Sequence, residues 1–221
     1  MPRQKEIYSH TKALADDLVR AANKTGNGML TLCLRPAAMF GEGDLTTTRK
    51  LIRNAKSGKN KFQIGSGQNL FDWTYVGNAA RAHILAAEAV LSTPHFSDTT
   101  NSRVDGEAFF ITNGEPMPFW EFVRAIGEEA GFPVSQKDVW VVPKIVGLAI
   151  AWIVEWTVWT MSLGKQRSTT TRQGIRYSCL TRTYRIDKAK ERLGYNPTVD
   201  MKEGISRAVR WWLTAKSKKH Q

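Results

Sequence analysis

Close to its start the chain carries the run Tyr8, Ser9, His10, Thr11, Lys12, Ala13, Leu14, Ala15, Asp16, Asp17, Leu18. Its alanine and leucine content, unbroken by glycine or proline, predicts a helix. In a helix Tyr8 and Lys12 share a face, because residues four apart stand one above the other. An ammonium group beside a phenol stabilises the phenolate, so such a pair can move a proton to or from an alcohol or a ketone. Taken alone, the pair also fits an ordinary helix surface on which Lys12 forms an ion pair with Asp16.

Several ordered motifs follow this helix. Gly26 to Gly28 predict a turn, and the apolar run from 29 to 34 predicts a strand buried on both faces, as in a parallel sheet. The strand leads into Arg35, Pro36, Ala37, Ala38, Met39, Phe40, Gly41, Glu42, Gly43, Asp44. Further along stand Phe71, Asp72, Trp73, Thr74, Tyr75, Val76, Gly77, Asn78, Ala79, Ala80, Arg81, Ala82, His83, then the segment 109–122, and finally Asp187, Lys188, Ala189, Leu193, Gly194, Tyr195 and Pro197.

Together these motifs resemble the extended short-chain dehydrogenase/reductases, and more narrowly their 3β-hydroxysteroid dehydrogenase and sterol-4α-carboxylate 3-dehydrogenase branch. The resemblance spans nearly the whole chain. It implies an α/β fold: the C-terminal part of a doubly wound, Rossmann-type parallel sheet with an interleaved substrate lobe. The segments 41–71 and 138–185 are expected to make up most of that lobe.

The resemblance also implies an activity and its residues. The intact enzyme would oxidise a 3β-hydroxyl group of a sterol or steroid to a ketone with NAD(P)+, in sterol or steroid biosynthesis. Tyr8 would be the general base, and Lys12 would stabilise its phenolate and hold the nicotinamide ribose. The residues expected at the nicotinamide end of the cofactor are Pro36, Ala37, Ala38 and Met39, although a plain turn out of the sheet explains them as well.

The family's cofactor turn is the element that the sequence does not show. In the family a Gly-x-x-Gly-x-x-Gly turn joins a strand to a helix and receives the pyrophosphate. The glycine pairs here, Gly26/Gly28, Gly41/Gly43 and Gly65/Gly67, lack that spacing, and the family's catalytic Ser or Thr has no room before Tyr8. We therefore expect residues 1–221 to be a fragment, a partial NAD(P)-binding domain that turns over poorly alone, with NAD or NADP left open.

An apolar segment from 143 to 163 stands apart from these motifs. Between Ile145 and Leu163 the only ionisable residue is Glu155, and three tryptophans recur at helical spacing. A helix that is apolar all round must be buried in protein or lipid. Three interpretations stay open: a helix lying in or dipping into a membrane, one inside the substrate lobe, and a true span.

A basic run follows this segment, with nine cations against Asp187 and Glu191. They are Lys165, Arg167, Arg172, Arg176, Arg182, Arg185, Lys188, Lys190 and Arg192. Cations next to an apolar segment favour a membrane surface, so residues 143–192 are expected to meet one. The formal net charge of +12 would also fit nucleic acid, but no nucleic-acid module surrounds the run, and none is expected as a partner.

Composition limits the remaining possibilities. Cys33 and Cys179 are far apart and predict free thiols, as in a reducing compartment, and the four histidines lack metal-ligand spacing, so no metal is expected. The expected location is intracellular, at the endoplasmic reticulum membrane, and otherwise its cytoplasmic face or the cytoplasm; self-association is left open. Two other functions remain open: a non-catalytic remnant that binds membranes or a partner chain, and a nucleotide-sugar epimerase or dehydratase with the same Tyr-x-x-x-Lys core.

Overall fold

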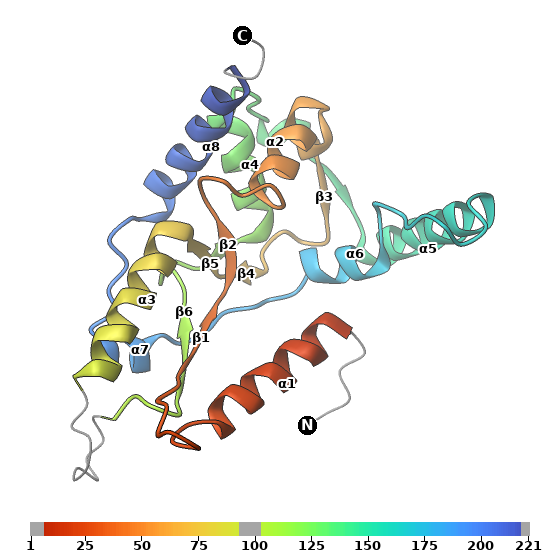
Figure 1. Ribbon diagram of the computed structural model, residues 1–221. Helices are drawn as coiled ribbons and strands as arrows, with labels where there is room; N and C mark the ends of the chain where they lie inside the picture. The colour runs from red at the N-terminus through yellow and green to blue at the C-terminus, as the bar shows by residue number, and fades with distance from the viewer. Residues whose placement is uncertain (1–6, 93–102, 218–221) are drawn as a thin grey trace. The chain divides into compact units, whose positions relative to one another are not determined.

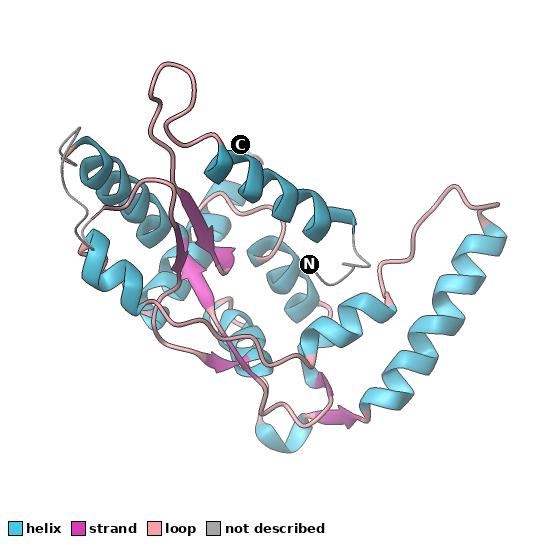
Figure 2. Cartoon of the chain, turned by 90° about the horizontal axis from the view of Figure 1, so that it is seen from below, coloured by secondary structure: helices cyan, strands magenta, loops and turns pink. Residues whose placement is uncertain are grey.

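The computed structural model describes residues 7–92 and 103–217, which form two compact units. The first unit contains Met1–Ala38, Thr74–Gly114 and Tyr184–Val199. The second contains Met39–Trp73, Glu115–Thr183 and Asp200–Gln221. Short strands and longer helices make up both units (Figure 2), and parallel strand pairs are present, so the predicted α/β class is confirmed.

Two parallel strands form the centre of the first unit. β1 (Cys33–Pro36) runs beside β6 (Ala108–Ile111), with Cys33 opposite Ala108 and Pro36 opposite Ile111. Helices α1 (Ile7–Ala21) and α3 (Val76–Leu91) pack on β1, and α7 (Asp187–Leu193) packs on β6 (Figure 1). Helices against parallel strands are typical of the doubly wound sheet that the sequence predicts.

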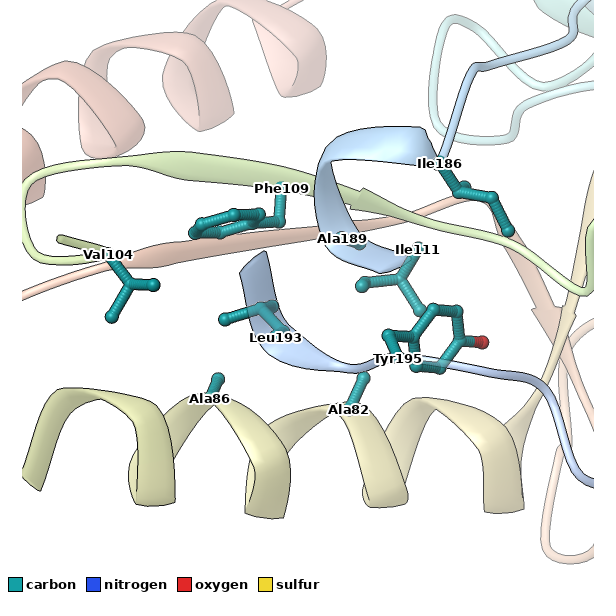
Figure 3. Packing of buried hydrophobic residues seen from close by; sticks show 9 residues of the cluster. All are labelled: Ala82, Ala86, Val104, Phe109, Ile111, Ile186, Ala189, Leu193 and Tyr195. Carbon is teal, nitrogen blue, oxygen red and sulfur yellow. The ribbon is translucent and has the colours of Figure 1, made fainter. Parts of the chain in front are cut away.

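The core of this unit lies between α3, β6 and α7 (Figure 3). Ala82 and Ala86 point from α3 toward Leu193 and Tyr195, and their small side chains let the helix approach closely. The Tyr195 hydroxyl donates to the carbonyl of Thr112 at 2.9 Å, and burial raises the pKa of Tyr195. The other members of the cluster are Val104, Phe109, Ile111, Ile186 and Ala189.

Two buried asparagines fasten three separate segments of the first unit. The Asn113 side-chain oxygen accepts from the backbone N–H of Tyr75 at 2.9 Å and from the Asn78 amide at 3.0 Å. Both amides also donate to the carbonyl of Val199, at 2.7 Å from Asn78 and 3.0 Å from Asn113. Buried polar groups must be paired, so the Asn78 of the Val-Gly-Asn-Ala-Ala motif has a structural duty.

The second unit is built from short strand pairs and several helices. β3 (Phe62–Ile64) pairs in parallel with β8 (Trp140–Val142), and β4 (Leu70–Phe71) pairs antiparallel with β7 (Met117–Pro118). Its described elements are β2 (Ala38–Phe40, the first residue of which belongs to the first unit), α2 (Thr48–Lys56), the 3₁₀ turn Lys59–Lys61, β3 (Phe62–Ile64), β4 (Leu70–Phe71), β7 (Met117–Pro118), α4 (Phe119–Glu129), the 3₁₀ turn Gln136–Asp138, β8 (Trp140–Val142), α5 (Lys144–Met161), α6 (Arg172–Ser178) and α8 (Met201–Ser217). The last described strand, β5 (Trp73–Tyr75), lies where the chain returns to the first unit.

Aromatic rings fill the core of the second unit. The rings of Trp73 and Phe122 stack with centroids 3.7 Å apart, and Phe40 meets Phe122 edge to face at 5.1 Å. Phe71 lies 4.9 Å from the Trp73 ring. Such rings bury much apolar area each and dominate the packing of small cores.

Three sequence expectations change. The strand expected over 29–34 begins only at Cys33, and Met29 is 58% exposed, so the run is not buried on both faces. The aromatic and branched residues of Tyr184–Ile186 predict a short strand, but they form none, and the Tyr184 ring stacks on Phe110 with centroids 4.5 Å apart. Asp187 is a residue type that predicts an N-cap, but in the structure it is the first residue of α7.

The unit that contains the expected substrate-lobe segments is also larger than they are. This second unit includes all of 41–71 and 138–183, and it also contains α4 and α8. The chain between 184 and 199 belongs to the first unit instead.

Candidate active site

Helix α1 presents Tyr8 and Lys12 on one face. The Lys12 ammonium nitrogen lies 5.8 Å from the centroid of the Tyr8 ring, as the spacing of four predicts. The Tyr8 side chain is open to its surroundings, since the residue is 67% exposed. The two groups can therefore reach the same small molecule.

Contacts between α1 and β1 show that the two elements run in opposite directions. The Thr31 hydroxyl donates to the carbonyl of Val19 at 2.8 Å, and the Cys33 thiol lies 3.8 Å from the carbonyl of Asp16. Arg35, further along the strand, also reaches Asp16. The first turn of α1 therefore lies toward the C-terminal end of β1, the end at which ligands bind in doubly wound sheets.

The segment after β1 begins at that same end. From Asp16 to Tyr8 the helix rises by about 12 Å, and from Arg35 to Ala38 an extended chain advances by about 10 Å. Ala37 is buried and donates its backbone N–H to the carbonyl of Ile111 at 2.9 Å, which fixes the exit of the chain from the strand. Tyr8, Lys12, Pro36, Ala37 and Ala38 thus share one end of the first unit, whereas Met39 begins the second unit.

Asp16 holds α1 in this position. Arg35 donates to both oxygens of the Asp16 carboxylate, from Nε at 2.9 Å and from Nη2 at 2.5 Å. Arg20 adds a contact at 3.1 Å from its own helix. The hydrogen bonds from Arg35 lower the pKa of Asp16, so the carboxylate stays ionised at neutral pH.

The sequence does not predict these contacts of Asp16 with Arg35 and Arg20, which we call the Asp16 clamp. It offered Asp16 as a surface partner of Lys12, whereas the carboxylate is only 16% exposed and pairs with Arg35 and Arg20. A usable signal was present, because an arginine at the end of an apolar strand needs an anion, and Asp16 lies on the preceding helix.

The described residues suit one end of a nicotinamide dinucleotide. The ammonium of Lys12 and the hydroxyl of Tyr8 are donors that match the hydroxyls of a ribose. For the pyrophosphate, no glycine-rich turn joins a strand to a helix within residues 7–92 and 103–217. Where β5 passes directly into α3, Gly77 lies against the Tyr75 ring, so that junction is filled by a side chain.

Comparison of the sequence with known proteins shows its family. The sequence profile of the 3-beta hydroxysteroid dehydrogenase/isomerase family matches residues 2–144, which include α1, β1 and the segment after it. The chain belongs to this family. The match ends where α5 begins.

The relatives match nearly all of this chain, but the match covers only part of their own length. A sterol-4-alpha-carboxylate 3-dehydrogenase, decarboxylating, of Saccharomyces cerevisiae is 40% identical over 206 residues, which are 93% of this chain and 56% of the yeast protein. A 3beta-hydroxysteroid-dehydrogenase/decarboxylase of Arabidopsis thaliana is 38% identical over 94% of this chain and 36% of its own length. The chain thus spans about half the length of the yeast relative and a third of the plant one.

Solved structures show the same fold. A dTDP-glucose 4,6-dehydratase of Bacillus anthracis, in complex with NAD, superposes with a TM-score of 0.59 and 20% identity over 97% of this chain and 54% of the dehydratase. An epimerase of Methanothermobacter thermautotrophicus gives a TM-score of 0.61 and 18% identity over 100% of this chain and 56% of the epimerase. At these identities the likeness concerns the fold alone.

Proposed function

We propose that this chain forms the substrate side of an NAD(P)-dependent 3β-hydroxysterol dehydrogenase, which oxidises a 3β-hydroxyl group to a ketone. One observation carries the proposal: Tyr8 and Lys12 share a face of α1 at the C-terminal end of β1. Membership of the 3-beta hydroxysteroid dehydrogenase/isomerase family supports the reaction class.

Each proposed residue has a defined role. Tyr8 takes the proton of the 3β-hydroxyl group onto its phenolate oxygen. Lys12 stabilises that phenolate by its charge and donates to the ribose hydroxyls. Pro36, Ala37 and Ala38, at the end of β1 in the first unit, line the nicotinamide end. When bound, the nicotinamide dinucleotide supplies the acceptor for the hydride that leaves C3.

A sterol-4α-carboxylate is the substrate class that we favour. The yeast relative is named for that substrate, and it is 40% identical to this chain. The nucleotide-sugar alternative has less support, since the dehydratase and the epimerase compared above are only 18–20% identical. A non-catalytic remnant would have no need of Tyr8 and Lys12 on one face.

We also propose that the chain meets a membrane surface, at the endoplasmic reticulum, through the second unit. Helix α5 is long and apolar enough to cross a bilayer, yet only 11% of it is buried. The exposed cations Lys165 and Arg167 follow it. A sterol dissolved in lipid would then be close to the enzyme, and vesicle flotation of the full chain tests this contact.

The catalytic proposal is tested by activity with a matched control. The chain alone is compared with a chimera. In the chimera, the part of the yeast relative that precedes the region matching this chain is joined ahead of residue 1. We expect little turnover by the chain alone, because its described residues contain no pyrophosphate turn. The chimera should form ketone and reduced cofactor from a 3β-hydroxysterol-4α-carboxylate.

Tyr8→Phe should lower kcat of the chimera by about 10²- to 10⁴-fold, the usual worth of a general acid or base. Lys12→Met should lower kcat as well and weaken cofactor binding, whereas Lys12→Arg should keep part of both. His10→Gln is the matched control. His10 is exposed and lies two positions from both Tyr8 and Lys12, so it does not share their face of α1, and its substitution should leave kcat unchanged. An active chimera that tolerates Tyr8→Phe would remove Tyr8 from the mechanism.

A further inference from the structure

Helix α5 exposes a broad apolar face. Among the outward residues, Ile145 is 81% exposed, Ile153 is 53% exposed, and Trp152, Trp156 and Trp159 are each 50–56% exposed. In a soluble protein so large a contiguous apolar surface marks a binding site for protein or lipid. Tryptophan at such a surface is typical of the boundary between acyl chains and headgroups.

The opposite face of α5 is covered by protein. Gly147 and Ala151 are buried, and a Cβ on Gly147 would lie 3.1 Å from Ile64 and 3.5 Å from Ile175. Helix α6 carries Ile175 and packs along this inner face (Figure 1). The helix is therefore two-sided in its surroundings although its sequence is apolar all round.

An ion pair ties the middle of α5 to the start of α6. The Glu155 carboxylate accepts from the backbone N–H of Arg172 at 2.8 Å and from Arg172 Nε at 2.6 Å. Burial acts to raise the pKa of Glu155, but these hydrogen bonds outweigh it and leave the pKa below its ordinary value. The acidic residue of the apolar helix therefore faces a cation and stays charged.

This packing decides how α5 can meet a bilayer. The helix is about 27 Å long, close to the thickness of a hydrocarbon core, so its length permits a crossing. A crossing would carry Arg172, Gln173 and Arg176 of α6 into the core, because α6 packs against α5 between Gly147 and Glu155. Lying in the plane of the surface leaves these polar groups on the water side.

Charge also matches a lipid surface. Lys165 and Arg167 are exposed just beyond the end of α5, where anionic headgroups would meet them. Further along the basic run, Lys188 and Arg192 pair with Glu107 in the first unit at 2.6 and 3.6 Å, and Arg185 pairs with Asp187 at 2.8 Å. The headgroup contact therefore rests on the two exposed cations that follow α5 directly, Lys165 and Arg167.

We propose that α5 lies flat in the interfacial layer of an anionic bilayer, with its exposed apolar face toward the acyl chains, and does not span the membrane. This inference rests on the proposed membrane contact but not on the dehydrogenase activity. Depth then depends on which face of the helix a residue occupies, and not on how far along the helix it lies.

The test measures depth with spin labels on the full chain. Cys33 and Cys179 are free thiols, and both are replaced first. Single cysteines are then placed at Ile145, Ile153 and Thr160, which lie on the exposed face in the first, middle and last turns, and at Val154 on the covered face. The probe is a vesicle of phosphatidylcholine and phosphatidylserine, and relaxation by oxygen and by a water-soluble nickel complex gives the depth.

We expect labels at all three outward positions about 5–10 Å below the headgroups, and the Val154 label shallower than all of them. A profile in which Ile153 is deepest, about 15 Å from each surface, with Ile145 and Thr160 shallow, would show a span and overturn the proposal. Labels that are shielded from both relaxants, and whose spectra are broadened by contact between copies, would show that a second chain covers this face. That result would also overturn the proposal.

Charge variants supply an independent readout. Lys165→Gln with Arg167→Gln should lower partitioning into these vesicles by about thirtyfold, since each cation near an anionic surface contributes a factor of about five. Lys50→Gln with Lys56→Gln on α2 makes the same change in net charge elsewhere in the second unit and is the matched control. Equal losses in both pairs, or no vesicle binding by the unsubstituted chain, would refute the interfacial docking without touching the catalytic proposal.

Discussion

Replacing Asp16 by alanine should release α1 from β1. Helix α1 buries none of its residues, so polar contacts supply much of what holds it. The substitution removes two hydrogen bonds from Arg35, at 2.9 and 2.5 Å. Hydrogen bonds to charged groups contribute about 1.5–3 kcal/mol. Because the Arg35 side chain is 38% exposed, solvent screening lowers the expected loss to about 1–2 kcal/mol.

Hydrogen exchange of the α1 amides measures this loss directly. A loss of about 1–2 kcal/mol should speed exchange in α1 by about 5- to 30-fold, while exchange in α8 of the second unit stays unchanged. Asp17→Ala is the matched control, since Asp17 pairs with Arg20 on the same exposed helix surface. If the α1 amides exchange equally fast in the Asp16→Ala and Asp17→Ala variants, the contacts of Asp16 do not position the helix.

The same clamp predicts a dependence on pH. Arg35 lowers the folded-state pKa of Asp16 below its unfolded value, so the carboxylate stabilises the fold above about pH 4. Protection of α1 should therefore be lost as the pH falls from about 4 through the folded pKa. Protection that is flat through this range would contradict the assignment.

Two further predictions concern the first unit. Asp105 is almost fully buried, and hydrogen bonds, of which that from Arg103 is the strongest, lower its pKa in the folded state. The carboxylate therefore stabilises the fold above about pH 4, and this stabilisation is lost as the pH falls below that value. Asp105→Asn should lower the free energy of unfolding by about 2 kcal/mol at neutral pH, and urea melts at a series of acid pH values should show a weaker dependence on pH than in the unsubstituted chain. Tyr195→Phe removes the buried hydrogen bond to Thr112 and should lower Tm by about 2–8 °C in calorimetry, and an unchanged Tm would show that this bond contributes little.

Sequence patterns predicted the elements whose residues meet one another locally. The Tyr8 and Lys12 pair and the apolar helix α5 both depend on helical spacing, which acts within a few residues. The family resemblance supplied the order of these elements and was confirmed by the family profile.

Long-range pairing could not be predicted in the same way. The aromatic and branched residues of 184–186 have the composition of a strand, but Tyr184 is there to stack on Phe110. Asp16 was assigned to a neighbour four residues away, whereas its carboxylate binds Arg35 across the turn. Such partners depend on which strand lies beside which helix, and one sequence does not state that.

The use of the basic run shows the same limit. The nine cations between residues 165 and 192 predicted one continuous membrane-binding surface. In the structure, however, Lys188 and Arg192 pair with Glu107 of the first unit. A count of charges along the chain cannot separate cations paired by the fold from those left for a partner. The structure, and not the sequence, shows that Lys165 and Arg167 are exposed.

The threefold interleaving of the two units affects how the protein can be made and divided. The first unit needs Tyr184–Val199 and the second needs Asp200–Gln221, so neither can be completed until nearly all of the chain has left the ribosome. Synthesis therefore exposes the hydrophobic α5 before its covering helix α6 exists, a period in which chaperones or a nearby bilayer would protect the nascent polypeptide. No single cleavage point separates the units either, and autonomous folding of one of them would require a circularly permuted or relinked gene.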